Sequence, residues 1–524
     1  MRSFIARISP AVKWFLNGFD RIVFKGGFPA FWNEANVPVW LERNNVLNKD
    51  FKTWMMAQTK TIVQRAEQMA ENHTGEPIVR FRSAARKEEV AHRHQRERDI
   101  DSGLIGVYWA LENCQSFKAF FDPNATRPAI RRLPTKCKHL YFYFDHPVFG
   151  FMSVRLQTWF PYSIQIQLNG REWLRRGLER EGIDFTRMGN KFLQIEDWGR
   201  AQSLLDQQVG CLWPKILDQF AKEVFPDKTA IIGAQPDYYW TLWQSEWASD
   251  LIFDDTAGLD AIGRDLIRHA FMIASPERVF RYLDRPLTRR EKIDLRCKDE
   301  VHSSIINFSD DHCSGYRVRH YAGKNSVKVY SEKNVLRVET TINNPGAFKI
   351  NRHKQGEATG GAKQRLPMRK GVADTAARAV VSQEVNKRVI EDLATLRSDQ
   401  PLCELLDTVC RAKHVKGRRV RALDPTGKDR AVLSSLFDPA CALSGINNRL
   451  IRERLVACAA AGGRSEKQLS AYVSRQIRLL RDHGLLRKLP KQNSYHLTPR
   501  GRKLITSFNA VYNASITELM EIAA

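Results

Sequence analysis

The sequence SEKQLSAYVSRQIRLLRDHGLLRKLPKQNSYHLTPRGRKL, residues 465–504, decides how the last part of the chain folds. Ser465 and Gln468 have the spacing of a capping box, so a helix should begin there. Apolar residues then recur every three or four positions, which predicts a helix with one packed side and basic residues on its other sides. The expected packed side comprises Leu469, Tyr472, Val473, Ile477 and Leu480. Gly484 stands where such a helix should stop.

The residues on either side complete a small module. A turn-rich tip at 490–494 and a short return strand at 495–497 predict a two-stranded wing. Thr498 and Pro499 then suit the cap and first position of a further helix, up to residue 509. Upstream, residues 430–437 and 447–457 predict two more helices. The expected order is helix, helix, recognition helix, wing, helix.

Three motifs of this module, VSRQIRLLR at 473–481, HGLL at 483–486 and LTPRG at 497–501, resemble the MarR- and ArsR-like winged-helix families. The resemblance covers roughly 80 residues, less than one domain of typical size. It implies a DNA-binding winged helix-turn-helix, with Arg475 and Arg478 nearest the bases. The further basic residues expected at phosphates are Arg481, Arg487, Lys488 and Lys491. A winged helix used only for protein contacts is the alternative.

Positive charge is concentrated in two stretches of a chain whose net charge is +25. Residues 411–524 hold 22 Lys and Arg against 8 Asp and Glu, and residues 349–371 hold 7 against 1. Such clustering attracts a polyanion, and we expect nucleic acid, with DNA favoured and RNA possible. The candidate phosphate contacts are Arg418, Arg419 and Arg421 in a basic cluster, and Lys363, Arg365, Arg369 and Lys370 in a flexible basic arm.

Length and composition exclude several classes. The 524 residues suffice for several domains, and the absence of an apolar run of membrane length predicts no membrane span. The N-terminus lacks a signal-peptide pattern, so we expect a cytoplasmic protein. Nine scattered cysteines without a C-x-x-C pair support neither a disulfide framework nor a zinc site.

The rest of the chain predicts a multidomain α+β protein with a central mixed β-sheet. Its expected parts are an N-terminal α/β portion (1–130), a central α+β region (131–348) with a helical insert (198–284), a basic linker (349–371), a helical connector (372–424) and the winged-helix domain (425–524). In the central region, strands are expected at 140–144, 151–159 and 163–168, then a helix at 171–181, and strands again at 316–321, 326–330 and 335–342.

Three carboxylates of the central region are candidate metal ligands. Asp145 ends the first strand of a meander, as in the entry arrangement of RNase H-like nucleases, although a turn-forming role before Pro147 is the favoured interpretation. Glu246 and Asp250 are four residues apart on the predicted helix, so they would share a face and could bind one cation together. An ion pair with an arginine is the alternative.

The segment VKVYSEK at 327–333, followed by LRVE at 336–339, resembles a hairpin of phage and plasmid rolling-circle replication initiators. Tyr330, Lys333, Arg337 and Glu339 occupy matching positions, whereas Ser331 stands where the family pattern has aspartate. The resemblance implies a nucleophilic tyrosine, a metal-binding glutamate and a lysine that neutralises phosphate. A sheet with one wet, basic face is the other interpretation.

These patterns favour a nucleic-acid-binding protein of bacterial mobile-element or replication type, with the winged helix recognising a site and the basic arm clamping the backbone. One alternative is a metal-dependent nuclease or transposase-like strand transferase using Mg²⁺ or Mn²⁺, with Asp145, Glu246, Asp250 and Glu339 as ligands. Another is a non-catalytic partner of a structured RNA, which would carry exposed aromatic side chains for base stacking.

Overall fold

A computed structural model describes most of the chain. The described residues are 12–81, 86–121, 128–233, 237–272, 276–283, 301–310, 313–354, 362–393, 401–415, 417–437, 446–488 and 494–523. They divide into two compact units. The first unit contains Leu16–Ser249 and Thr341–Gln383; the second contains Met1–Phe15, Asp250–Thr340 and Glu384–Ala524. The chain is α+β, as the sequence predicts.

The first unit is built on a mixed sheet with the strand order β9-β1-β6-β5-β4-β3-β2. Neighbours from β1 to β3 are antiparallel, whereas β2 pairs in parallel with β3. The strands are β1 (Val12–Gly27), β2 (Val79–Arg80), β3 (Gly103–Phe120), β4 (Ala129–His146), β5 (Gly150–Gln157), β6 (Ile164–Asn169) and β9 (Tyr239–Phe253).

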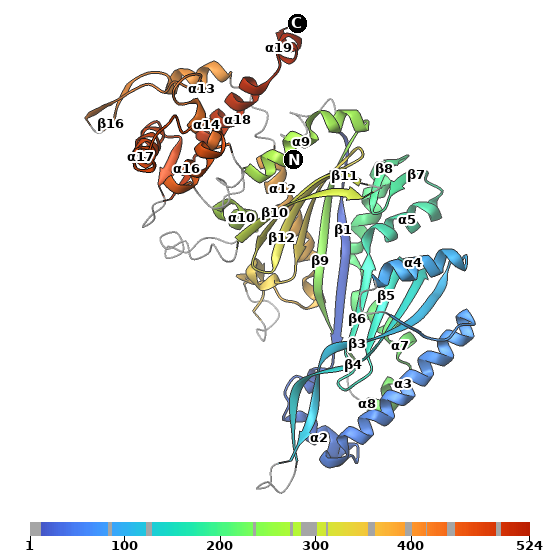
Figure 1. Cartoon of the computed structure of the whole chain (residues 1–524). Coiled ribbons are helices and arrows are strands. Elements are labelled where there is room, and N and C mark those ends of the chain that lie inside the picture. The colour runs from blue at the N-terminus through green and yellow to red at the C-terminus, as the bar shows by residue number, and fades with distance from the viewer. Residues whose placement is uncertain are drawn as a thin grey trace. The chain divides into compact units, whose positions relative to one another are not determined.

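Helices cover this sheet because its strands are apolar on both sides. The helices of the first unit are α2 (Asn36–Arg43), α3 (Phe51–Thr74), α4 (Lys87–Glu97), α5 (Gly170–Glu181), α6 (Trp198–Gln207), α7 (Trp213–Val224) and α8 (Lys228–Ile232). Figure 1 shows α3 running beside β3 and β4. Phe142, Leu156 and Ile166 from neighbouring strands are buried with Trp213 and Leu217 of α7 in one core.

Two sequence predictions for this unit are wrong. The helix expected at 238–253, within the helical insert 198–284, is strand β9. Trp240, Trp243 and Trp247 have helix-like spacing, but aromatic and β-branched residues fit a half-buried strand better, and Trp240 and Leu242 alternate as buried residues. The boundary expected after residue 130 falls inside β4, because β3 pairs with β4 along almost its whole length.

Smaller elements complete the first unit. They are the hairpin of β7 (Phe185–Met188) and β8 (Lys191–Ile195), the hairpin of β14 (Lys349–Arg352) and β15 (Gln364–Pro367), and the short helices η1 (Pro29–Phe31), η2 (Asn48–Asp50), η3 (Gln208–Gly210), η5 (Pro345–Ala347) and η6 (Val372–Asp374). The linker expected at 349–371 is therefore a β-hairpin in its described parts, since alternating residues there pair across strands. Residues 355–361 lie outside the described residues.

The second unit contains an antiparallel strand succession and a helical C-terminal region. The strands β10 (Val301–Asp310), β11 (Cys313–Ala322), β12 (Asn325–Glu332) and β13 (Val335–Ile342) follow one another in the sheet order. Tight turns join β11 to β12 and β12 to β13, with Gly323 at φ +58° in the first and Lys333 at φ +52° in the second. This unit also contains the helices α9 (Thr256–Met272) and α10 (Pro276–Tyr282). Helix α12 (Thr375–Leu393) begins in the first unit and ends in the second.

The C-terminal region follows the element order expected from the sequence. It contains α13 (Leu402–Val409), β16 (Lys413–Val415), β17 (Arg418–Val420), α14 (Arg430–Ser435), α16 (Asn448–Ala457), α17 (Glu466–Asp482), β18 (Leu486–Lys488), β19 (Tyr495–Leu497), α18 (Pro499–Asn513) and α19 (Ile516–Ala523). Ser465 and Gln468 form both hydrogen bonds of the capping box, and Thr498 caps α18. The connector expected at 372–424 is helical only in part, because 413–420 forms the β16–β17 hairpin.

Candidate nucleic-acid interface

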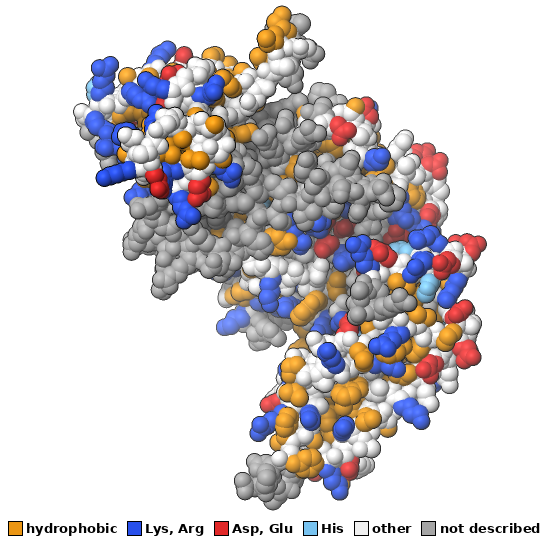
Figure 2. Space-filling view, viewed as in Figure 1, with side chains coloured by type: hydrophobic (Ala, Val, Ile, Leu, Met, Phe, Trp, Pro, Cys, Tyr) orange, Lys and Arg blue, Asp and Glu red, His pale blue; other side chains and the backbone are white. Residues whose placement is uncertain are grey.

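One side of α17 carries cations that are open to solvent. Lys467, Arg475 and Arg478 are exposed, and their spacing along the helix places them on the same side. Within the described residues, none of the three has an ion-pair partner. We call the surface formed by Lys467, Ser474, Arg475 and Arg478 the α17 face. Figure 2 shows Lys and Arg side chains gathered over the C-terminal region that contains it.

Buried polar contacts fix α17 from the opposite side. The Gln476 amide donates to the Asp429 carboxylate at 2.9 Å, and Asp429 also accepts from Arg421 at 2.6 Å and from the backbone N–H of Asp424. Burial by itself raises the pKa of Asp429, but its hydrogen bonds with Arg421, Asp424 and Gln476 leave the pKa below its ordinary value. The carboxylate therefore stays charged and holds α17 against the residues before α14.

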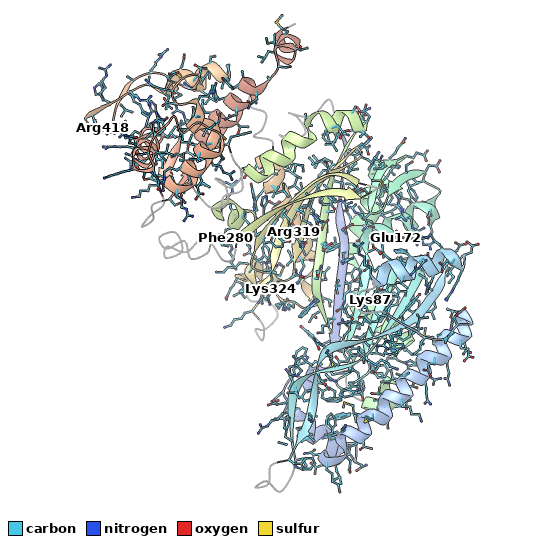
Figure 3. All side chains as sticks on the ribbon, viewed as in Figure 1. Lys87, Glu172, Phe280, Arg319, Lys324 and Arg418 are labelled. Atoms are coloured by element: carbon cyan, nitrogen blue, oxygen red, sulfur yellow. The ribbon has the colours of Figure 1, made fainter. Side chains whose placement is uncertain are left out.

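Three of the arginines expected to contact phosphate instead form ion pairs with carboxylates of the same chain. Arg418, labelled on the β16–β17 hairpin in Figure 3, forms an ion pair with Asp482. Arg481 contacts the same carboxylate at 3.3 Å, and Arg421 is bound to Asp429. These three guanidinium groups neutralise Asp482, at the C-terminal end of α17, and Asp429, which directly precedes α14. They are less available to an external polyanion than the cations of the α17 face.

The remaining C-terminal candidates differ among themselves. Lys488 on β18 and Arg419 on β17 are exposed cations without ion-pair partners in the described part of the chain. Arg487 is exposed as well, although it has an interaction within the chain. Lys491 lies outside the described residues.

The candidates of the basic arm belong to the first unit. Lys363 and Arg365 are exposed around β15, with Arg365 engaged in an interaction of its own. Arg369 forms an ion pair with Asp374 of η6 at 2.7 Å, so its charge is already neutralised within the chain. Lys370 instead places its ammonium group over the Trp243 ring, 4.4 Å from the ring centroid.

Asp145 lies at the end of β4, as expected. Its carboxylate accepts from the Gln95 amide at 2.7 Å, forms a short ion pair with Arg176 and lies 3.9 Å from Arg175. The two arginines supply the positive charge that a metal would otherwise supply. The geometry therefore matches the plainer interpretation, a carboxylate that ties the strand end to α5.

Glu246 and Asp250 do not share a helix face, because both lie on strand β9. Four residues of strand span about 13 Å, too far for both carboxylates to bind one cation. Asp250 is buried and accepts two hydrogen bonds from Arg337, at 2.5 and 2.8 Å. This is the arginine ion pair that the sequence offered as the alternative. Glu246 accepts from the Gln244 amide at 3.1 Å.

The hairpin that resembles replication initiators brings two candidate residues together. The Tyr330 hydroxyl donates to the Glu339 carboxylate at 3.1 Å. Glu339 is buried and pairs with Lys328, whereas the matching lysine expected from the resemblance, Lys333, is exposed at the β12–β13 turn. Burial raises the pKa of Glu339, but Lys328 and Arg337 lower it below its ordinary value. Glu339 is therefore a charged acceptor beside a phenol.

Sequence reasoning missed a cleft in the first unit. It has a volume of about 460 Å³, and Lys25, Trp32, Arg155, Tyr239 and Trp243 are among the residues that line it. We call it the Trp243 cleft. Trp243 lies in the segment expected to be a helical insert, so no sequence pattern placed it beside Lys25. The sequence does not show which of its many aromatic residues are exposed, because that depends on how the strands and their flanking segments pack.

Comparison with known proteins does not assign a family. No family model, curated protein or solved structure matches this chain. Within the part of the chain that the structure describes, none of the helices has the length and apolar character needed to cross a membrane.

Proposed function

We propose that the chain is a nucleic-acid-binding protein whose C-terminal region acts as a winged helix-turn-helix, with α17 in a groove of a duplex. The α17 face carries this proposal. Its cations are exposed and have no carboxylate partners in the described structure, whereas three neighbouring arginines are neutralised within the fold. Exposed cations on one helix face are suited to phosphates and to base edges.

The β18–β19 hairpin supports the same interpretation. Its two strands pair in register from Leu486 with Leu497 to Lys488 with Tyr495, which presents Lys488 to solvent beside the hairpin tip. A cation on such a wing contacts phosphate without reading sequence. The length of the chain before this region fits a mobile-element or replication-type factor, in which a further part acts on the bound nucleic acid.

The test begins by selecting preferred sequences from a random duplex pool with the full chain. Binding of the selected duplex and of an unrelated duplex is then measured by fluorescence anisotropy over a salt series. We expect the Arg475→Gln and Arg478→Gln variants to lose about 1–3 kcal/mol each on the selected site and to lose preference between the two duplexes. Lys488→Ala should weaken both duplexes equally.

Arg449→Gln is the matched control. Arg449 is exposed on α16, and it is engaged with Glu453 at 2.8 Å. Its loss should leave both affinities nearly unchanged. Equal losses from Arg449→Gln, Arg475→Gln and Arg478→Gln would show that α17 has no special role.

Strand cleavage is a second candidate function, favoured by the hydrogen bond between Tyr330 and Glu339. Glu339 would accept the phenol proton while the tyrosine oxygen attacks phosphorus. The bond from phosphorus to one sugar oxygen would break, and that oxygen would take up a proton as the leaving hydroxyl. Supercoiled plasmid incubated with the protein and Mg²⁺ or Mn²⁺ tests this activity. Cleavage that is lost in both Tyr330→Phe and Glu339→Gln would establish it, and intact plasmid with normal duplex binding would leave only the binding function.

A further inference from the structure

The Trp243 cleft has an unusually exposed aromatic rim. The side chains of Trp32, Tyr239 and Trp243 are 55%, 45% and 43% exposed. Trp32 and Tyr239 contact each other edge to face, with ring centroids 5.2 Å apart. Large aromatic rings gathered around an opening commonly mark a binding site, because their apolar faces are left in water without a partner.

Positive charge surrounds the same rings. The ammonium groups of Lys25 and Lys370 lie 4.9 and 4.4 Å from the Trp243 centroid. Neither lysine forms an ion pair with any carboxylate that the structure describes. Burial lowers the pKa of Lys25, and the nearby charges of Arg155 and Lys370 lower it further. Like charges held together without a carboxylate are stabilised when an anion binds between them.

The backbone holds these groups in place. The Leu242 N–H donates to the Lys370 carbonyl at 2.7 Å, and the Thr241 hydroxyl donates to the Lys25 carbonyl at 3.0 Å. Strands β1 and β9 and the segment after β15 therefore hold the backbone from which both lysines reach Trp243. Glycine at 371 leaves space for the Tyr239 side chain, because a Cβ at 371 would lie 2.9 Å from the Tyr239 hydroxyl oxygen.

The wall of the cleft is also fixed. Arg155 is held by Glu112 at 3.1 Å and by Gln165 at 3.2 Å. Glu112 in turn accepts from Lys87, labelled in Figure 3, at 2.6 Å. The side of the cleft formed by β3 and β5 is thus a connected polar network. A site built on strands with positioned side chains is already arranged for its ligand.

We propose that the Trp243 cleft holds an unpaired nucleotide of a single-stranded nucleic acid. The base lies against the exposed aromatic rim, and the phosphate lies near Lys25 and Lys370. This assignment rests on the proposed nucleic-acid-binding function and adds a single strand to the duplex as a second ligand. Bases in a duplex are stacked on their neighbours, so only an unpaired base can offer its face to an aromatic ring. The ring contact is tolerant of sequence, because every base has such a face.

The test measures anisotropy of short labelled deoxythymidine and uridine oligonucleotides with the full chain. We expect Trp243→Ala to weaken single-strand binding by about 5- to 150-fold, the range measured for one stacked base. Trp243→Phe should recover part of that loss, since it keeps a ring. Lys25→Gln should weaken binding more than Lys25→Arg, which keeps the charge. The two oligonucleotides together show whether DNA or RNA is the better source.

Trp14→Ala is the matched control. Trp14 is 49% exposed on β1, and eleven residues of strand place it about 36 Å from Lys25. Its loss should leave single-strand binding unchanged. Equal effects of Trp14→Ala and Trp243→Ala would overturn the assignment, and so would free thymidine monophosphate binding as tightly as the oligonucleotide. Normal duplex binding in Trp243→Ala separates either failure from a failure of the proposed function.

A second measurement guards against a variant that fails to fold. Cys114 lines the same cleft, and its side chain is partly exposed. In the unmodified protein, bound oligonucleotide should slow alkylation of Cys114, which peptide mass spectrometry can follow residue by residue. Unchanged alkylation at saturating oligonucleotide would contradict occupation of the cleft.

Discussion

The α17 face and the Trp243 cleft both present cations without carboxylate partners, yet their surroundings differ. On α17, Arg475 and Arg478 stand three residues apart on the exposed side of a regular helix. At the cleft, the Trp243 ring lies close to Lys25, which lines the cleft, and to Lys370, and other exposed aromatic residues line the same opening. A convex cationic helix suits a groove between paired strands, whereas a concave aromatic site suits an unpaired base. We therefore expect similar charge to serve duplex binding at the α17 face and single-strand binding at the Trp243 cleft.

Gly501→Ala should have the largest effect, because it should disrupt the region that carries the α17 face and leave the Trp243 cleft intact. A Cβ at 501 would lie 2.2 Å from the Leu485 carbonyl oxygen, and backbone cannot move aside as a flexible side chain can. We expect the C-terminal region to lose about 3 kcal/mol or more, above the usual cost of overpacking. Thermal melting and duplex binding should both suffer, while single-strand binding persists. Ser507→Ala on the same helix is the control, and equal stability of the two variants would contradict this packing.

Asp429→Asn should have the next largest effect, a loss of about 2 kcal/mol in the free energy of unfolding at neutral pH. It removes the negative charge to which Arg421 and Gln476 both donate hydrogen bonds. The folded pKa of Asp429 is lowered, so its contribution is present above the unfolded pKa of about 3.9 and is lost as pH falls through the folded pKa. Chemical denaturation of both proteins across that acid range measures the difference. A gap that stays constant down to the most acid pH would exclude the charge as its cause.

Ser465→Ala sharpens the comparison by loosening only the start of α17. The Ser465 side chain accepts from the Gln468 backbone N–H, and the Ser465 backbone N–H donates to the Gln468 side-chain oxygen. Loss of such a cap costs about 1 kcal/mol. Hydrogen exchange of the first turn should become faster, with a small loss of duplex affinity and none of single-strand affinity. Ser465→Asp, which can still cap, should behave like the unmodified protein.

The smallest effect is expected from alkaline pH, which should change single-strand affinity a few-fold relative to duplex affinity. The pKa of Lys25 is lowered by burial and by Arg155 and Lys370, so this lysine loses its charge at lower pH than an ordinary lysine. Arginines stay charged throughout. Single-strand affinity should therefore fall first as pH rises, while duplex binding by α17 persists. Lys25→Arg should remove the difference, and parallel pH profiles in the unmodified protein would argue against Lys25 as a phosphate contact.

Local patterns predicted the C-terminal region well. The capping box at Ser465, the Thr498 cap and the positive-φ stop at Gly484 all depend on contacts within a few residues, so they can be recognised in the chain itself. The strands of the meander at 140–168 were predicted for the same reason. Strand β9 was not, because its pairing partners are far away in sequence and its tryptophans mimic a helical spacing.

The candidate residues show the same division. Exposure of Arg475 and Arg478 followed from the apolar stripe on the other side of α17. The ion pairs of Arg418 with Asp482 and of Arg421 with Asp429 were not predicted. For Asp250 an arginine partner was one of two alternatives, but only the fold identifies it as Arg337, far away in the chain. Whether a cation is open or occupied is therefore a property of the fold.

The amino-acid sequence alone determined where charge is concentrated and where helices with strong local signals begin and end, because these depend on composition and on neighbours along the chain. Only the tertiary structure decided which cations keep their charge open to solvent, and only it brought Lys25, Lys370 and Trp243 together from three separate segments. The physical reason is that electrostatic and aromatic contacts act over a few ångströms in space, whatever the separation of the residues in the chain.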